Sequence, residues 1–189
     1  MFTKKSISRI FSVLFTIIFI LSVTPGQAAH AAGVRYYAKP GGTGDCSSWA
    51  NACELQTALT GATSGDEIWV AAGTYKPTAG TDRTATFQLK DGVALYGGFA
   101  GTETARSQRD PAVNITTLSG DIGISDDNSD NLYHVVTGED GATIDGFTIT
   151  AGNANSGNCP GKDCYGGGMY NSTSSPAVTN VVFNGNSGT

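Results

Sequence analysis

A run of acidic and amide side chains in the middle of the chain has the residue types of a calcium site. Its four aspartates fall within ten residues, and carboxylate and amide oxygens are the hard ligands that Ca²⁺ prefers. The alternative is a solvated loop, because segments rich in Asp, Asn and Ser commonly connect strands. The spacing also lacks the pattern of an EF-hand loop. Ca²⁺ is therefore the only candidate cofactor, and its candidate ligands are Asp121, Asp126, Asp127 and Asp130.

The four cysteines form two close pairs, which favours two local disulfides in an exported protein. Six residues separate Cys46 from Cys53, and four separate Cys159 from Cys164. The alternative is a metal site, but neither pair has the C-x-x-C spacing of zinc sites. Beyond the predicted signal peptide the chain also has a single histidine, His134, so few nitrogen ligands are available to complete a metal site. Each disulfide would staple one loop.

Residues 1–31 have the features of a secretory signal peptide. Lys4, Lys5 and Arg9 precede a charge-free apolar run at 10–23, and Ala29-His30-Ala31 fits a cleavage site. The alternative is a membrane anchor, but this run is shorter than the ~20 residues that span a bilayer as a helix. We therefore expect a secreted, extracellular or cell-surface (outer-membrane) protein with no transmembrane span after cleavage.

The charge of the chain argues against two classes of partner. After cleavage the protein keeps eight of its eleven basic residues and all sixteen acidic ones, for a net charge of −8. Nucleic acids and anionic lipids are bound through Lys and Arg, so neither is expected as a partner. An extracellular polysaccharide or another cell-surface protein fits this surface better.

The 26 glycines and the low content of charged residues favour short strands joined by turns. After the signal, only residues 54–62 have apolar side chains at helical spacing, and Asn51 with Glu54 resembles a capping arrangement. Residues 66–75, 86–89 and 93–96 follow as expected strands. One short helix cannot form a core, so it must pack on these strands.

Internal repeats indicate that the strands are stacked in coils. Gly92–Gly97 aligns with Gly141–Gly146 at an offset of 49 residues, and Ile144–Ile149 aligns with Val178–Phe183 at an offset of 34. Unequal offsets are expected where loops vary in length and the stacked strands do not. The alignment predicts an inward stack of Leu95, Ile144 and Val178, followed by turn positions with positive φ at Gly97, Gly146 and Asn180.

Two segments resemble known families. The stretch Ser64–Tyr75, which follows the predicted helix, resembles the opening of right-handed parallel β-helix proteins of the pectin-lyase-like group. Gly166–Tyr170 followed by Phe183–Asn186 is similar to polymorphic outer membrane protein repeats, although Met169 replaces the usual small residue. The resemblance implies an all-β, right-handed parallel β-helix with a short N-terminal capping helix.

These features and the resemblance together divide the chain into a signal peptide at 1–31, a cap with the helix and first disulfide loop at 32–64, and β-helix coils at 65–189. The sequence ends at Thr189, one turn after a strand. An open last coil would expose its core and a strand edge. We therefore expect an incomplete set of coils, truncated at the C-terminus, which indicates a truncated reading frame, a fragment, or a partner coil supplied by another chain.

The resemblance also implies which residues a catalytic member of the group would carry. β-Helix polysaccharide lyases carry clustered aspartates for calcium and an Arg or Lys base. Between Asp110 and Gly161 the chain has no Arg or Lys, and His134 has no obvious nucleophile beside it in sequence. We expect a non-catalytic protein with an adhesive, structural or carbohydrate-binding role, and we assign no catalytic or carbohydrate-binding residues. The alternative is a polysaccharide-active enzyme, pectate-lyase-like or glycosidase-like, or a fragment of one.

Overall fold

Parallel β-strands make up most of the regular structure, as the all-β expectation requires. The computed structural model describes residues 33–157 and 160–188, so the predicted signal peptide lies outside the described residues. Within these ranges there is one α-helix, and no helix is long and apolar enough to cross a membrane.

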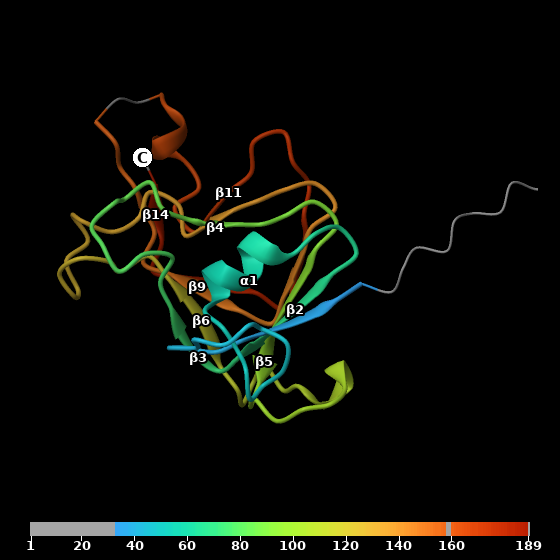
Figure 1. Ribbon diagram of the computed structural model, residues 1–189. Helices are drawn as coiled ribbons and strands as arrows, with labels where there is room; N and C mark the ends of the chain where they lie inside the picture. Colours follow the sequence, from blue (N-terminus) through green and yellow to red (C-terminus); the bar gives the residue numbers. More distant parts are fainter. Residues whose placement is uncertain (1–32, 158–159, 189) are drawn as a thin grey trace, which may run out of the picture.

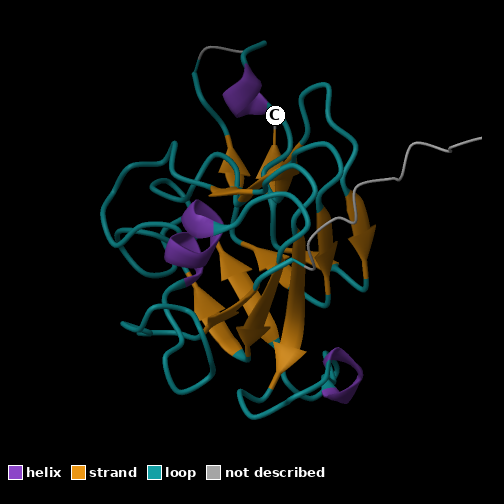
Figure 2. Ribbon diagram, turned by 45° about the vertical axis from the view of Figure 1, so that its right-hand side comes forward, coloured by secondary structure: helices purple, strands orange, loops and turns teal. Residues whose placement is uncertain are grey.

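The strands are arranged in three parallel sheets and one additional strand pair (Figures 1 and 2). In spatial order, sheet A contains β1 (Arg35–Ala38), β2 (Glu67–Ala71), β5 (Ala94–Phe99), β8 (Thr143–Asp145) and β12 (Ala177–Thr179). Sheet B contains β3 (Gly73–Tyr75), β6 (Thr116–Ser119), β9 (Thr148–Thr150) and β13 (Val182–Asn184). Sheet C contains β4 (Phe87–Gln88), β7 (Val136–Thr137) and β11 (Met169–Tyr170), and β10 (Asn153–Ala154) pairs with β14 (Ser187–Gly188).

The chain visits these sheets repeatedly in the same order. From β2 onward it passes from sheet A to sheet B and then to sheet C, and it begins again in sheet A at β5, β8 and β12. Each strand therefore pairs with the strand one passage earlier rather than with its neighbour in sequence. In Figure 1, β3, β6 and β9 illustrate this arrangement.

The predicted register of the repeats is confirmed. Leu95 pairs with Ile144, and Ile144 pairs with Val178, on neighbouring strands of sheet A. Leu95 and Ile144 are buried, but Val178 is 43% exposed. The predicted burial of Val178 is therefore wrong, because β12 is the edge strand of sheet A among the described residues and nothing there covers its outer side.

One hydrophobic core lies between the three sheets. It combines apolar side chains that are almost completely buried: Ile68, Leu95 and Ile144 from sheet A, Leu118 and Ile149 from sheet B, and Phe87 and Val136 from sheet C. Strands as short as these cannot bury an apolar face alone, so each passage depends on the passages above and below it.

Two of the three predicted turn positions have positive φ. Gly146 has φ of +86° and Asn180 has φ of +49°, whereas Gly98, not Gly97, adopts the left-handed conformation. The difference arises in β5, where an irregularity in pairing between Trp69 and Ala71 places one extra residue opposite β2. Gly97 is needed for another reason, since a Cβ there would lie 2.4 Å from the carbonyl oxygen of Gly146.

The predicted helix is present as α1 (Leu55–Gly61), which packs its buried face, including Leu55, against the start of the sheets (Figure 2). The predicted capping arrangement is wrong. Glu54 is the N-cap residue, but it makes no side-chain capping hydrogen bond. Its carboxylate instead accepts a hydrogen bond from the backbone N–H of Gly41.

The region predicted as a cap also contributes β1 to sheet A, so the stack begins earlier than residue 65. The outer edge of β1 is covered by the loop that the Cys46–Cys53 disulfide closes. Tyr37 N–H donates to the carbonyl of Cys46, and Cys53 N–H donates to the carbonyl of Tyr37. The outward backbone groups of Tyr37, near the middle of this first strand, are thus satisfied within the chain.

Candidate functional site

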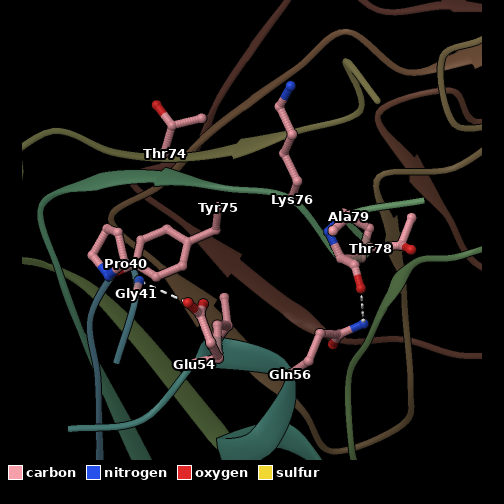
Figure 3. A pocket seen from close by; sticks show the side chains of 11 residues that line it. Pro40, Gly41, Glu54, Gln56, Thr74, Tyr75, Lys76, Thr78 and Ala79 are labelled. Carbon is pink, nitrogen blue, oxygen red and sulfur yellow. Dashed lines mark hydrogen bonds between the residues drawn. The ribbon is translucent and has the colours of Figure 1, made fainter. Parts of the chain in front are cut away.

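A cleft of about 580 Å³ opens between the start of α1 and the segment that follows β3 (Figure 3). We call it the helix-side cleft. Its lining combines apolar and polar side chains from three separate segments: Pro40, Gly41, Glu54, Leu55, Gln56, Thr74, Tyr75, Lys76, Pro77, Thr78 and Ala79. Such a mixture is typical of small-molecule sites, where apolar walls carry a few placed hydrogen-bonding groups.

Two side chains at the start of α1 hold the walls of this cleft together. The Glu54 Oε1 atom accepts a hydrogen bond of 2.7 Å from Gly41 N–H, which fixes the loop after β1. The Gln56 Nε2 atom donates to the carbonyls of Pro77 at 3.2 Å and Thr86 at 3.1 Å, which fixes the opposite wall. The cleft is therefore built from segments that are tied to one another.

Tyr75 and Lys76 leave the wall of the helix-side cleft in different directions. Tyr75 is buried, its hydroxyl donates to the carbonyl of Ala71 at 2.8 Å, and burial together with the nearby Glu54 charge raises its pKa. The Lys76 ammonium points away from Glu54 (Figure 3) and pairs with Asp121 at 3.3 Å. The Tyr75 hydroxyl is consequently no proton donor to a ligand.

A second cleft, of about 740 Å³, lies between the loop after β5 and the turn between β12 and β13. We call it the arginine cleft, and it is lined by Arg106, Ser107, Arg109, Asp110, Pro111, Ala112, Asn180, Val181 and Val182. Arg109 is its most enclosed cation. Its guanidinium pairs with the Asp145 carboxylate and donates to the carbonyl oxygens of Gly97 at 3.1 Å and Asp145 at 3.3 Å.

The other arginine of this cleft is more exposed and is held from one side. Arg106, at the start of the 3₁₀ turn Arg106–Gln108, donates to Glu67 at 2.9 Å and to the Tyr96 hydroxyl at 2.7 Å. Its guanidinium lies 4.5 Å from the centre of the Tyr96 ring. Because Asp145 also accepts from Asn180, the charges of Arg109 and Asp145 are largely satisfied by protein groups.

The role of Arg109 is not evident from the sequence. Arg109 immediately precedes the interval without Arg or Lys that begins at Asp110, and it reaches Asp145, 36 residues further along the chain. Stacking of β5 on β8 brings the two together, with Tyr96 opposite Asp145 in the register. The repeat alignment places Tyr96 beside Asp145, but it does not include Arg109, so it identifies only the strand position of Asp145.

Three of the four predicted calcium ligands, Asp121, Asp127 and Asp130, bind loop backbone or a lysine through their carboxylates. Asp121 pairs with Lys76 and accepts from Asp126 N–H, Asp130 accepts from Ile124 N–H, and Ser129 N–H donates to Asp127 and lowers its pKa. Within residues 33–157 and 160–188, no three acidic, histidine or cysteine side chains form a group that could hold a metal. The structure thus gives these aspartates loop-stabilising contacts, and calcium binding stays a prediction.

The predicted disulfides differ in what the structure describes. The Cys46–Cys53 bond is confirmed. Cys159 lies outside the described residues, so its predicted bond to Cys164 stays a prediction. Cys164 itself is buried at the end of the 3₁₀ turn Lys162–Cys164.

His134 has a carboxylate neighbour that the sequence did not reveal. Its Nε2 atom lies 3.3 Å from Asp163, near enough for an ion pair but not aligned for a hydrogen bond. Its Nδ1 atom lies 3.3 Å from the Gly166 carbonyl, and its ring stacks on Tyr170. Burial lowers the pKa of His134, so the neutral form predominates at pH 7. His134 lines neither cleft.

Both tryptophans are used to build the structure. Trp69 is completely buried, stacks on Phe99 and is covered by the Arg35 guanidinium. Trp49 packs against Tyr37 and Phe99, and its indole N–H donates to the carbonyl of Glu103. The faces of the Trp69 ring are therefore closed to a sugar, whereas Trp49 is half-buried and lines neither cleft.

One comparison with known proteins identifies a family, and its description names no activity. No curated protein and no solved structure matches the chain. A family model, described as "Protein of unknown function (DUF1565)", matches residues 52–189, which include α1, both clefts except Pro40 and Gly41, and every strand after β1. The match covers well over half of the sequence, and the chain belongs to the DUF1565 family.

Proposed function

We propose that the chain is a non-catalytic secreted or cell-surface protein, anchored at or released from the outer membrane, that binds carbohydrate in an adhesive role. Its architecture in this proposal is a right-handed parallel β-helix of the pectin-lyase-like kind with polymorphic outer membrane protein-type repeats. The repeated passage through three parallel sheets around one core supports this architecture. The family match supports it too, because DUF1565 is associated with parallel β-helix proteins.

The helix-side cleft is the observation that carries the binding role. Sugars present C–H faces that pack on apolar walls and hydroxyl groups that donate to fixed acceptors. Pro40, Leu55 and Pro77 provide apolar wall, and Glu54 and Gln56 are held in place by hydrogen bonds from and to the backbone. Pre-positioned groups of this kind lower the entropic cost of binding a flexible ligand.

The arginine cleft supports a second candidate function, a polysaccharide lyase or glycosidase. A cation and a carboxylate meet there at Arg109 and Asp145, on neighbouring passages of the chain. However, Arg109 is engaged by three protein acceptors. A guanidinium also keeps its proton throughout the physiological pH range, so a role as general base is disfavoured. Stabilisation of a negatively charged transition state is the role that this geometry leaves open.

The test is a binding and turnover screen of the secreted protein against neutral, cationic and uronic-acid oligosaccharides, with and without Ca²⁺. Ala79→Trp fills the helix-side cleft without removing a wall hydrogen bond, and Ala112→Trp fills the arginine cleft in the same way. We expect binding without turnover, lost in Ala79→Trp and kept in Ala112→Trp. Turnover that Ala112→Trp abolishes would establish the enzyme, and absence of binding to every saccharide would refute the carbohydrate-binding role.

A further inference from the structure

The helix-side cleft contains a carboxylate without a charged partner. Glu54 forms no ion pair with any residue in the described parts of the chain, and only its Oε1 atom is used, by Gly41 N–H. Figure 3 shows this carboxylate beside Pro40 and Tyr75, directed into the cleft. The Oε2 atom is therefore an available acceptor that carries negative charge.

The cation that lines the same cleft does not neutralise Glu54. Lys76 is paired with Asp121 at 3.3 Å and points away from Glu54 (Figure 3). The charge of the cleft is thus that of Glu54. The chain as a whole has the same sign, since it carries sixteen acidic and eleven basic residues even before signal cleavage. Such a field attracts cationic ligands and repels uronic acids.

The hydrogen-bonding groups of the cleft match an ammonium group better than a carboxylate. An ammonium has three donors and no acceptor. Glu54 Oε2 offers a charged acceptor, and the amide oxygen of Gln56 offers a neutral one, because Gln56 uses its nitrogen for the carbonyls of Pro77 and Thr86. The hydroxyl group of Thr78 at the same cleft suits a ring hydroxyl of a sugar, which a lysine side chain lacks.

We propose that the helix-side cleft selects saccharides with a free amino group, whose ammonium binds Glu54 while the sugar ring lies against Pro40 and the polar rim. This inference rests on the proposed carbohydrate-binding function and names its ligand class. Glu54 is exposed at the cleft, and Lys76, the one cation that lines it, is already paired with Asp121, so no lining cation competes with the ammonium for Glu54.

Titration calorimetry of the secreted full chain with a glucosamine oligomer tests this assignment. Glu54→Gln removes the charge but retains an oxygen that can accept from Gly41 N–H, so the cleft keeps its wall. We expect binding to weaken about ten-fold, because a charge-assisted hydrogen bond is replaced by a neutral one. Asp91→Asn is the matched control, since it removes an exposed carboxylate outside the cleft, and it should bind as tightly as the native chain.

Different results would refute ammonium recognition by Glu54 and carbohydrate binding by the chain. Equal binding by the native chain and Glu54→Gln, or equal affinity for N-acetylated oligomers of the same length, would refute ammonium recognition and leave carbohydrate binding intact. Equal affinity for a lysine-containing peptide would refute the saccharide as ligand. Loss of binding to every saccharide class would refute the proposed function itself. Thermal melting of each variant shows whether the fold is retained.

Discussion

Truncation of Ile144 to alanine measures how strongly one stacked residue holds neighbouring passages together. Ile144 is completely buried and lies between Leu95 and Val178 in sheet A. The substitution removes three carbon atoms, which corresponds to about 2.4 kcal/mol of transfer free energy at about 0.8 kcal/mol per buried methylene. The cavity adds to this cost, because strands on both sides keep the site from collapsing. We expect a total loss of about 3–4 kcal/mol in the free energy of unfolding.

Val178→Ala is the internal control, because it lies one strand away in the same stack but is 43% exposed. It removes two carbon atoms from a half-covered position, so we expect a loss of about 1 kcal/mol. Urea unfolding followed by tryptophan fluorescence is suitable, since buried Trp69 in β2 reports on sheet A. Equal losses for the two variants would refute the conclusion that the core is sealed at Ile144 and open at Val178.

Two further predictions concern the polar contacts. Arg109→Ala leaves Asp145 with Asn180 as its remaining side-chain partner, and it should lower the free energy of unfolding by about 2–3 kcal/mol. Arg109→Lys should restore only part of this stability, because a lysine ammonium lacks the planar guanidinium group that donates to several acceptors at once. Full recovery by lysine in urea unfolding would contradict the network described for Arg109. Burial lowers the pKa of His134 in the folded protein below its usual value of about 6.5. The unfolded chain therefore binds the proton more readily than the folded chain does. The free energy of unfolding should consequently fall as the pH drops below about 6.5. His134→Gln should flatten this dependence between about pH 8 and pH 5, and an unchanged slope would show that another group is responsible.

The register of the sheets could be predicted because it depends on local features. The Gly92–Gly97 and Gly141–Gly146 repeats place Leu95 opposite Ile144, and the structure has this pairing. Alternation along a strand and the chemistry of the following turn are both visible within six residues of sequence. An extra residue in β5 was not visible in this way, and it moved the left-handed conformation from Gly97 to Gly98.

The candidate site was much less predictable, because it is formed by segments that meet only after stacking. The spacing of Asn51 and Glu54 predicts a capping arrangement, but the Glu54 carboxylate accepts its hydrogen bond from Gly41 N–H in the loop after β1. Arg109 reaches Asp145 across 36 residues, and no local pattern marks that contact. The aspartates from 121 to 130 have the composition of a metal site, yet backbone amides of their own loop are nearer partners.

The loop closed by the Cys46–Cys53 disulfide also determines how molecules of this protein can meet. Its backbone occupies the hydrogen-bonding edge of β1, so a second molecule cannot add a strand there without first displacing the loop. An unprotected parallel sheet edge is a template for aggregation. Because the covalent bond that secures the loop persists in oxidising compartments and is reduced in the cytosol, protection of this edge is coupled to the redox environment. A chain retained in a reducing compartment would therefore be more prone to aggregate through β1 than the same chain after oxidation.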